Sequence, residues 1–280
     1  MPEPVDLAYC MKLPPKEAIA YLTGKGYAIT WDWEDLWQQA HAKAFTVAKV
    51  AKLDILQDIR DVLQHALTEG QTAAWFEKEL TPVLKAKGWW GEQEQRNPDT
   101  GELEQVQLGS PWRLETIYRA NTQTAYMAGR YAEQIENVDN RPFWQYIAVM
   151  DGRTRPAHRA LHGLAFRFDD PFWQSFYPPN GWNCRCRVTT LSGGDLTRDR
   201  VKPSRSDGML GSTQKLVSKK TGELREVATY SARHPDDPSG KRRLIVSPDV
   251  GWSHNPGAAW KPETARYTGN LTELAKRELQ

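Results

Sequence analysis

One segment, residues 151–191, constrains this chain more than any other. It contains His158 and His162, and then Cys184 and Cys186 after a Pro-Pro-Asn-Gly turn. Side chains alternate along an extended backbone, so the two cysteines of Cys-Arg-Cys lie on one side of it. Two histidines four residues apart on a helix also share one face. A disulfide across one intervening residue would close a small, strained ring, so we expect free thiols.

These residue types leave three interpretations open. Histidine and cysteine are ligands of zinc, although H-x3-H followed by C-x-C is not the spacing of a standard zinc finger. A cysteine beside a histidine is also the composition of a catalytic nucleophile pair, but no flanking signature of a known cysteine hydrolase accompanies it. In the third interpretation the cysteines are small buried hydrophobic residues and the histidines lie on a helix surface.

The segment resembles the signature of the phage Mu F-like family of head morphogenesis proteins, which are minor capsid proteins of tailed phages. The family's elements occur in the family's order: Asp151, Thr154-Arg155-Pro156, His158, Leu161-His162-Gly163, Asp169-Asp170-Pro171-Phe172, Pro178-Pro179, Gly181, Asn183 and Cys184-Arg185-Cys186. Several of these elements are uncommon, so the resemblance is specific. It covers the middle of the chain and implies a structural role in head assembly.

The resemblance also bears on the choice of metal ligands. The family often has Asn or Asp where His162 stands, so a four-ligand site that includes His162 would be particular to this chain. If the family shares a metal site, the resemblance favours Asp151, His158, Cys184 and Cys186. Together with His162, these five residues are the candidate ligands, and zinc is the candidate ion.

The composition is that of a soluble intracellular protein. A chain of 280 residues forms one large domain or two small ones. It has no run of eighteen apolar residues, and its first ten residues lack the basic and apolar blocks of a secretory signal, so no membrane partner is expected. Three cysteines, with Cys10 isolated, argue against a disulfide framework. The net charge of +2 does not indicate nucleic-acid binding by the whole chain.

The N-terminal part, residues 1–90, is expected to form a helical arm. Cap residues and apolar spacing predict helices over residues 15–22, 33–47, 55–67 and 73–87. The chain has twelve tryptophans, which occur in every part of it. Aromatic residues of this kind serve as anchors at interfaces as well as in cores, which suits an assembly protein.

Residues 91–110 are polar and turn-rich, and they are expected to form a β-hairpin or a loop. Ser110 followed by Pro111 predicts the start of a helix that runs to about Glu136 and packs closely against another backbone. Residues 144–150 and 187–191 read as two paired strands, with a short helix at 156–161 between them. Residues 111–192 are therefore the expected Mu F-like domain, a long helix with a small α+β core.

The C-terminal part, residues 193–280, is expected to be irregular and basic, which completes an α+β fold class. Its first half, up to residue 243, contains twelve Lys or Arg against seven Asp or Glu. This excess fits contact with DNA phosphates or an ordinary solvated surface. Residues 243–246 read as a strand, and 249–257 resemble a second element found near the end of Mu F-like proteins. Residues 262–278 read as a polar helix or tail.

Two classes of function follow. The sequence has no G-x-S-x-G, H-E-x-x-H, Walker A or G-x-G-x-x-G motif. The resemblance implies a non-enzymatic minor head protein near the portal, located in the virion after assembly in the host cytoplasm. Its partners would be the portal, other head proteins and packaged DNA. The alternative is a metal-dependent or Cys-His hydrolase acting during DNA packaging or head maturation, with Asp151, His158 and a cysteine as its machinery.

Overall fold

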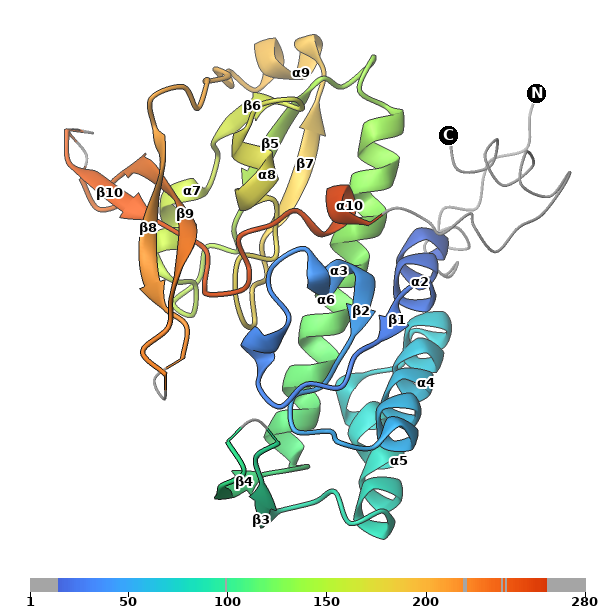
Figure 1. The fold of residues 1–280 in the computed structure, drawn as a ribbon. Coiled ribbons are helices and arrows are strands. Elements are labelled where there is room, and N and C mark those ends of the chain that lie inside the picture. Colours follow the sequence, from blue (N-terminus) through green and yellow to red (C-terminus); the bar gives the residue numbers. More distant parts are fainter. Residues whose placement is uncertain (1–14, 99, 219–220, 238, 240, 261–280) are drawn as a thin grey trace, which may run out of the picture.

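The computed structural model describes residues 15–98, 100–218, 221–237, 239 and 241–260. A long helix, α6 (Pro111–Glu136), runs through the molecule, with the N-terminal elements beside one half and the signature segment beside the other (Figure 1). Its predicted start is confirmed, because Ser110 Oγ accepts a hydrogen bond from the Arg113 amide at 3.3 Å. The helix contributes buried residues to two hydrophobic cores and so joins them.

The N-terminal arm packs three helices against α6: α2 (Lys16–Thr23), α4 (Leu53–Glu69) and α5 (Ala73–Ala86). These helices were predicted, and so were two of their ends. Gly70 ends α4 in the left-handed conformation at φ 64°, and Thr72 Oγ1 caps α5 by accepting from the Trp75 amide at 3.2 Å. The close packing expected of α6 is found at Gly129, where a Cβ would lie 2.9 Å from the amide nitrogen of Ala18.

The helix predicted over residues 33–47 is wrong. This stretch forms a 3-10 turn η1 (Trp33–Asp35), a short helix α3 (Ala40–Lys43) and strand β2 (Ala44–Phe45), which pairs in parallel with β1 (Gly26–Tyr27). Gln38 has φ 43°, which breaks a helix at that point. The apolar spacing instead reflects tertiary contacts, such as the stacking of Trp33 on His41 with ring centroids 3.7 Å apart.

The polar segment after the arm is a hairpin. Strands β3 (Glu92–Arg96) and β4 (Leu103–Gln107) pair antiparallel, which confirms the hairpin alternative. The second strand places Val106 in the first core. The hairpin therefore extends the arm beside the start of α6.

The signature segment forms a three-stranded antiparallel sheet with β5 (Phe143–Ile147) between β6 (Ala165–Arg167) and β7 (Arg187–Leu191). The predicted pairing of β5 with β7 is confirmed. Strand β6 was not predicted, because three residues are too short to show an alternating pattern. Short helices surround the sheet: α7 (Pro156–Leu161), as predicted, α8 (Phe172–Phe176) and α9 (Gly193–Arg198).

The C-terminal part is more regular than expected. Strands β8 (Leu210–Leu216), β9 (Leu224–Arg233) and β10 (Arg243–Val246) form an antiparallel sheet, followed by the short helix α10 (Pro256–Ala259). The expectation of an irregular segment is wrong here, whereas the strand at 243–246 is confirmed. Tyr230, Ala232 and Val246 pack into the second core, which is why these strands are held. The helix or tail predicted at 262–278 lies outside the described residues.

The α+β fold class is thus confirmed. The second core is rich in aromatic rings and has Trp144 fully buried near its centre, with Phe166, Trp173 and Tyr177 around it. In the part of the chain that the structure describes, no helix is long and apolar enough to cross a membrane.

Candidate metal centre

His158 and the two cysteines of Cys-Arg-Cys come together inside the signature domain. His158 lies on α7, and the cysteines lie on the extended stretch that leads into β7. His158 Nδ1 is 3.7 Å from Cys184 Sγ and 3.3 Å from Cys186 Sγ. All three side chains are buried. Within the described residues, they form the one group of three or more His, Cys, Asp or Glu side chains close enough to share an ion.

The separation of the ligand atoms fits zinc. Zinc–sulfur bonds of about 2.3 Å and zinc–nitrogen bonds of about 2.0 Å at tetrahedral angles place sulfur and nitrogen about 3.5 Å apart. The two measured separations lie on either side of that value. A set of two cysteines and one histidine leaves a fourth coordination position for another ligand.

The surroundings also fit a metal. A cavity of about 20 Å³ borders the three ligands, which is room for one water molecule in the fourth position. Without a metal, a hydrogen bond from Cys186 and the nearby His158 hold the pKa of the Cys184 thiol well below its usual range. The same hydrogen bond and burial raise the pKa of Cys186. A lowered pKa favours the thiolate of Cys184, which is the form of cysteine that binds zinc.

His162 does not join this group. Helix α7 ends at Leu161, and His162 has ψ 131°, so the histidines do not share a helical face as expected. Its Nδ1 instead accepts a hydrogen bond from the Ala148 amide at 3.1 Å. The side chain is exposed and ties the end of α7 to the end of β5.

Asp151 also lies outside the group of three, and a charged partner occupies its carboxylate. Arg185 makes two hydrogen bonds to it, at 2.6 and 2.8 Å, so the pair is bidentate. The Arg185 guanidinium holds the pKa of the Asp151 carboxyl well below its usual range. This pair joins the turn at Asp151 to the cysteine stretch, and it orients the cysteines by holding the residue between them.

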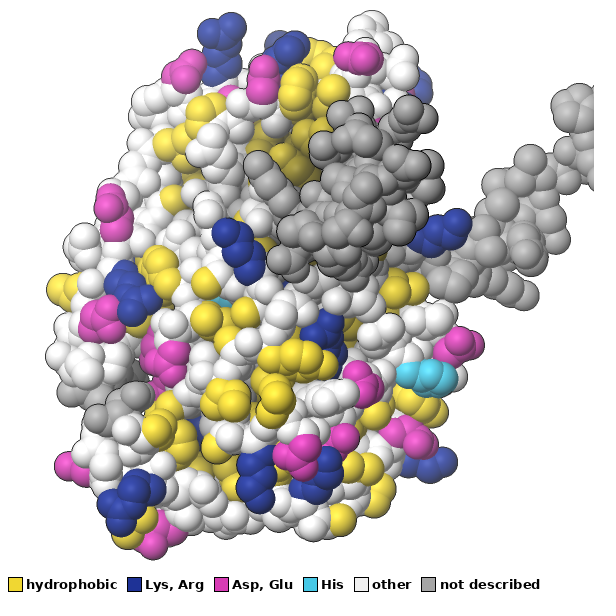
Figure 2. All heavy atoms as spheres, turned by 45° about the vertical axis from the view of Figure 1, so that its right-hand side comes forward, with side chains coloured by type: hydrophobic (Ala, Val, Ile, Leu, Met, Phe, Trp, Pro, Cys, Tyr) yellow, Lys and Arg dark blue, Asp and Glu magenta, His cyan; other side chains and the backbone are white. Residues whose placement is uncertain are grey.

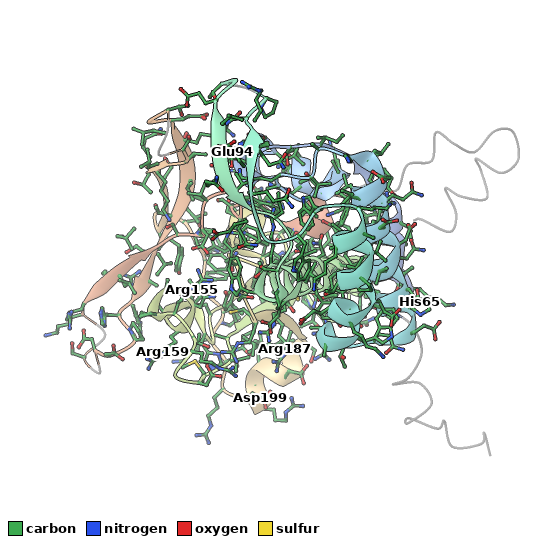
Figure 3. The ribbon with its side chains drawn as sticks, turned by 90° about the horizontal axis from the view of Figure 1, so that it is seen from below. His65, Glu94, Arg155, Arg159, Arg187 and Asp199 are labelled. Carbon is green, nitrogen blue, oxygen red and sulfur yellow. The ribbon has the colours of Figure 1, made fainter. Side chains whose placement is uncertain are left out.

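The other arginines of the motif differ in their contacts. Arg155 donates to Asp249 Oδ2 at 2.6 Å and to the Trp182 carbonyl at 2.5 Å. Arg153 Nη2 lies 3.7 Å from Asp151 Oδ2, and the Arg153 side chain is largely exposed. Arg187, in contrast, is exposed on β7 and takes no part in this network (Figure 3).

Replacing Arg185 with Lys is expected to lower the thermal midpoint by a few degrees at pH 7, because an ammonium cannot reproduce a bidentate fork. The pKa of Asp151 is depressed in the folded state, so the pair stabilises above the unfolded pKa of about 3.9 and this stability is lost as pH falls through the folded value. The difference between Arg185→Lys and the native protein should therefore shrink in acid. Calorimetry at several pH values measures it.

Arg187→Lys is the matched control, since it makes the same change two residues away on an exposed side chain. It should leave the midpoint unchanged. Equal midpoints for both variants at pH 7 would show that the Asp151–Arg185 pair does not stabilise the domain.

The second family-like element docks on this site. Asp249 reaches Arg155, and a Cβ on Gly181, which has φ 156°, would overlap the Asp249 carboxylate. Asn255 caps α10 by accepting from the amides of Gly257 and Ala258 at 3.0 and 3.1 Å. Glycine at position 181 thus allows the close approach of Asp249, whereas Asn255 fixes the start of α10.

Sequence reasoning missed two residues beside the candidate metal ligands. Tyr146 on β5 is fully buried and hydrogen-bonds Asn180 through their side-chain oxygens at 2.9 Å. The hydroxyl of Tyr146 also interacts with Cys186. The alternating pattern of β5 could have indicated an inward Tyr146, but its neighbours follow only from the fold.

A model of a known protein family covers this site. Residues 57–189 match the family model described as Phage Mu protein F like protein. The resemblance seen in the sequence is confirmed, because these residues match the Mu F-like family model. The matched region contains His158, Cys184 and Cys186.

Two relatives extend the similarity across the chain. "Putative capsid assembly protein F" of Escherichia phage Mu is 45% identical over 278 residues, which is 99% of this chain and 62% of the Mu protein. The "Mu-like prophage FluMu F protein" of Haemophilus influenzae is 42% identical over 254 residues, 90% of this chain and 58% of that protein. The chain thus spans about three fifths of these relatives. No solved structure matches it.

Proposed function

We propose that this chain acts in assembly of a tailed-phage head, as a non-enzymatic minor head protein. The observation that carries the proposal is its 45% identity, over nearly all of its length, to a relative named for capsid assembly. Its partners are then other head proteins, with the portal foremost. Its location is the virion, after assembly in the cytoplasm of an infected or lysogenic host.

The surface for a head partner is proposed at the start of α6. The arm's tryptophans were expected to be anchors, but Trp31 and Trp89 are buried in the first core. Trp112, in contrast, is 69% exposed. It borders an apolar groove of about 420 Å³ together with Val47 and Ala48 of the arm. Exposed aromatic anchors beside apolar grooves contribute strongly to protein interfaces.

Contact with packaged DNA is proposed at the β9–β10 hairpin. Arg233 and Arg243 face each other across the strands, and Lys241 and Arg242 follow in the connecting turn, all of them exposed. On the face of the arm shown in Figure 2, basic and acidic side chains are interspersed, which does not favour DNA there. Binding through phosphate contacts should weaken steeply as salt rises.

The metal group is proposed to hold zinc for stability. Asp151 is engaged by Arg185, so it is not free to act as a general base. His158, Cys184 and Cys186 are buried and together border a cavity of about 20 Å³, which has no room for a peptide or nucleotide substrate. A larger cavity, of about 170 Å³, borders Cys184 but neither His158 nor Cys186. These observations favour the structural role over the Cys-His hydrolase.

Deleting the gene for this chain from its phage is expected to give empty, misassembled or non-infectious heads, because an assembly component would be missing. Electron microscopy and plaque counts measure this. Complementation with the native gene should restore infectivity, and Trp112→Ala should restore it only partly if this surface binds a head protein. The control is Trp90→Ala, a tryptophan that packs against the first core.

Normal heads with full infectivity in the deletion strain would contradict the assembly role. A variant with both Cys184→Ser and Cys186→Ser that melts like the native protein, yet stops head maturation at a cleavage step, would support the hydrolase instead.

A further inference from the structure

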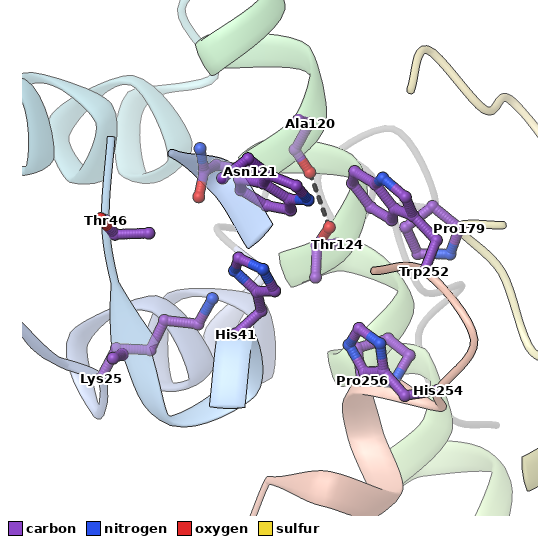
Figure 4. Close-up of a pocket in the computed structure, with 12 residues that line it drawn as sticks. Lys25, His41, Thr46, Ala120, Asn121, Thr124, Pro179, Trp252, His254 and Pro256 are labelled. Carbon is purple, nitrogen blue, oxygen red and sulfur yellow. Dashed lines mark hydrogen bonds between the residues drawn. The ribbon is translucent and has the colours of Figure 1, made fainter. Parts of the chain in front are cut away.

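A second polar cluster lies where the arm, α6 and the C-terminal element meet. It surrounds a cavity of about 30 Å³. Lys25 and His41 come from the arm, His254 from the stretch before α10, and Asn121 from α6 (Figure 4). The side chain of Lys25 extends toward the imidazole of His41. The cavity is not lined by His158, Cys184 or Cys186. Lys25 and His41 lie outside the signature of residues 151–186, and His254 lies in the second family-like element.

Several polar nitrogens at this cavity have no partner among the described residues. His41 Nε2, His254 Nδ1 and the indole nitrogens of Trp33 and Trp252 are buried without a hydrogen bond among the described residues. Each imidazole has a nitrogen available here, and each indole offers one N–H. Such groups are costly to bury unpaired, so four around one cavity point to a missing partner. The two indole N–H groups can only donate, so that partner has to accept hydrogen bonds.

The charge around the cavity has one sign. Its lining includes a lysine and two histidines but no Asp or Glu. Lys25 is 7% exposed, and its ammonium lies over the ring of Tyr21, 4.6 Å from the centroid. A buried ammonium with no carboxylate at the same cavity is expensive unless an anion joins it.

The cost of burying positive charge here lowers the pKa values of the three basic side chains at the cavity. Burial, and then the charge of Arg60, lower the pKa of Lys25 to about 7. Burial and the charge of Lys25 lower the pKa of His41 to about 3 and of His254 to about 4. Lys25 therefore disfavours a charge on either histidine, and an anion among the three would favour the charged form of each.

We propose that this cavity binds a small inorganic oxyanion of the phosphate type. Lys25 supplies the charge, the indole N–H groups of Trp33 and Trp252 donate to the oxygens, and the two histidines provide further donors when protonated. The cavity has room for an anion that replaces about two water molecules. A phosphate within a DNA backbone carries two ester groups, which a cavity of this size does not accommodate.

Bound there, the anion joins two parts of the chain beside α6. The arm contributes Lys25, Trp33 and His41, whereas the C-terminal element contributes Trp252 and His254. Trp33 and Trp252 also stack with centroids 5.6 Å apart. The site therefore stabilises the junction beside α6, a role separate from the zinc group and from the proposed head contacts.

Inorganic phosphate added to the full chain is expected to raise the thermal midpoint and to change tryptophan fluorescence saturably, in a background of constant ionic strength. Lys25→Met should weaken phosphate binding about tenfold or more, because it removes a charge-assisted hydrogen bond. Trp33→Phe keeps the stacking but loses the N–H and should weaken binding by roughly fivefold. Lys16→Met, an exposed lysine on α2, is the matched control.

Lys25→Met also removes a buried unpaired charge, so without phosphate it should melt at or above the native midpoint, which separates lost binding from lost folding. A double-stranded DNA fragment is the second arm. If DNA shifts the midpoint equally in the native protein and in Lys25→Met, DNA binds outside this cavity. The cavity is then a site for free phosphate alone. Absence of saturable phosphate binding, or equal binding by Lys25→Met and the native protein, would overturn the proposal.

Discussion

Treatment with a zinc chelator is expected to lower the thermal midpoint of this protein by roughly 10 °C. Metal-binding free energy contributes to folding free energy wherever the ligands come together only in the native state, and structural zinc supplies about 10 kcal/mol or more in small fingers. This chain has two cores of its own, so we expect only several kcal/mol, which for a chain of this size is about 10 °C. Calorimetry with and without chelator measures the shift.

Variants of the five candidate ligands identify which side chains hold the ion. Cys184→Ser, Cys186→Ser and His158→Gln should each lose the metal, measured as zinc per chain by elemental analysis. Asp151→Asn and His162→Asn should keep it, because these residues lie outside the group of three. They serve as matched controls for changes in the same motif.

A protein purified without metal that melts identically in chelator would contradict the zinc site. The cysteines would then be buried small residues of the second core. If Asp151→Asn lost zinc while its thermal midpoint stayed unchanged, Asp151 would instead be a zinc ligand.

Gly257→Ala is expected to destabilise the protein by about 2 kcal/mol, through the cost of overpacking. A Cβ at this position would lie 2.6 Å from Cγ of Tyr131 on α6, closer than real contacts allow. Tyr131 packs on Trp144 and Tyr177 of the second core, so it cannot move away without disturbing them. Denaturant unfolding measures the change.

Gly193→Ala is the control for this variant. A Cβ there meets nothing within 4 Å, and the residue begins α9, so alanine should be neutral or slightly stabilising. If Gly257→Ala were as stable as Gly193→Ala, the docking of α10 on α6 would not contribute to folding. Zinc content should be native in both variants, because neither touches the ligands.

Much of the arrangement followed from the sequence alone. Ser110-Pro111, Thr72 and Gly70 marked helix ends, because caps act through local backbone groups. The alternating stretches around Trp144 and Val188 predicted the paired strands, since their burial repeats every second residue. The uncommon motif of residues 151–186 indicated the family and the pairing of His158 with the cysteines.

Only the tertiary structure decided the rest. The periodicity of residues 33–47 suggested a helix, yet the Trp33 ring stacks on His41 and Trp252, which belong to other elements. The spacing of His158 and His162 suggested a shared face, yet the chain leaves the helix between them. The cavity of Lys25, His41 and His254 joins residues more than two hundred positions apart. Local sequence patterns predict helix caps and the buried faces of helices and strands. Contacts between residues far apart in the sequence depend instead on how α6 brings the two cores together.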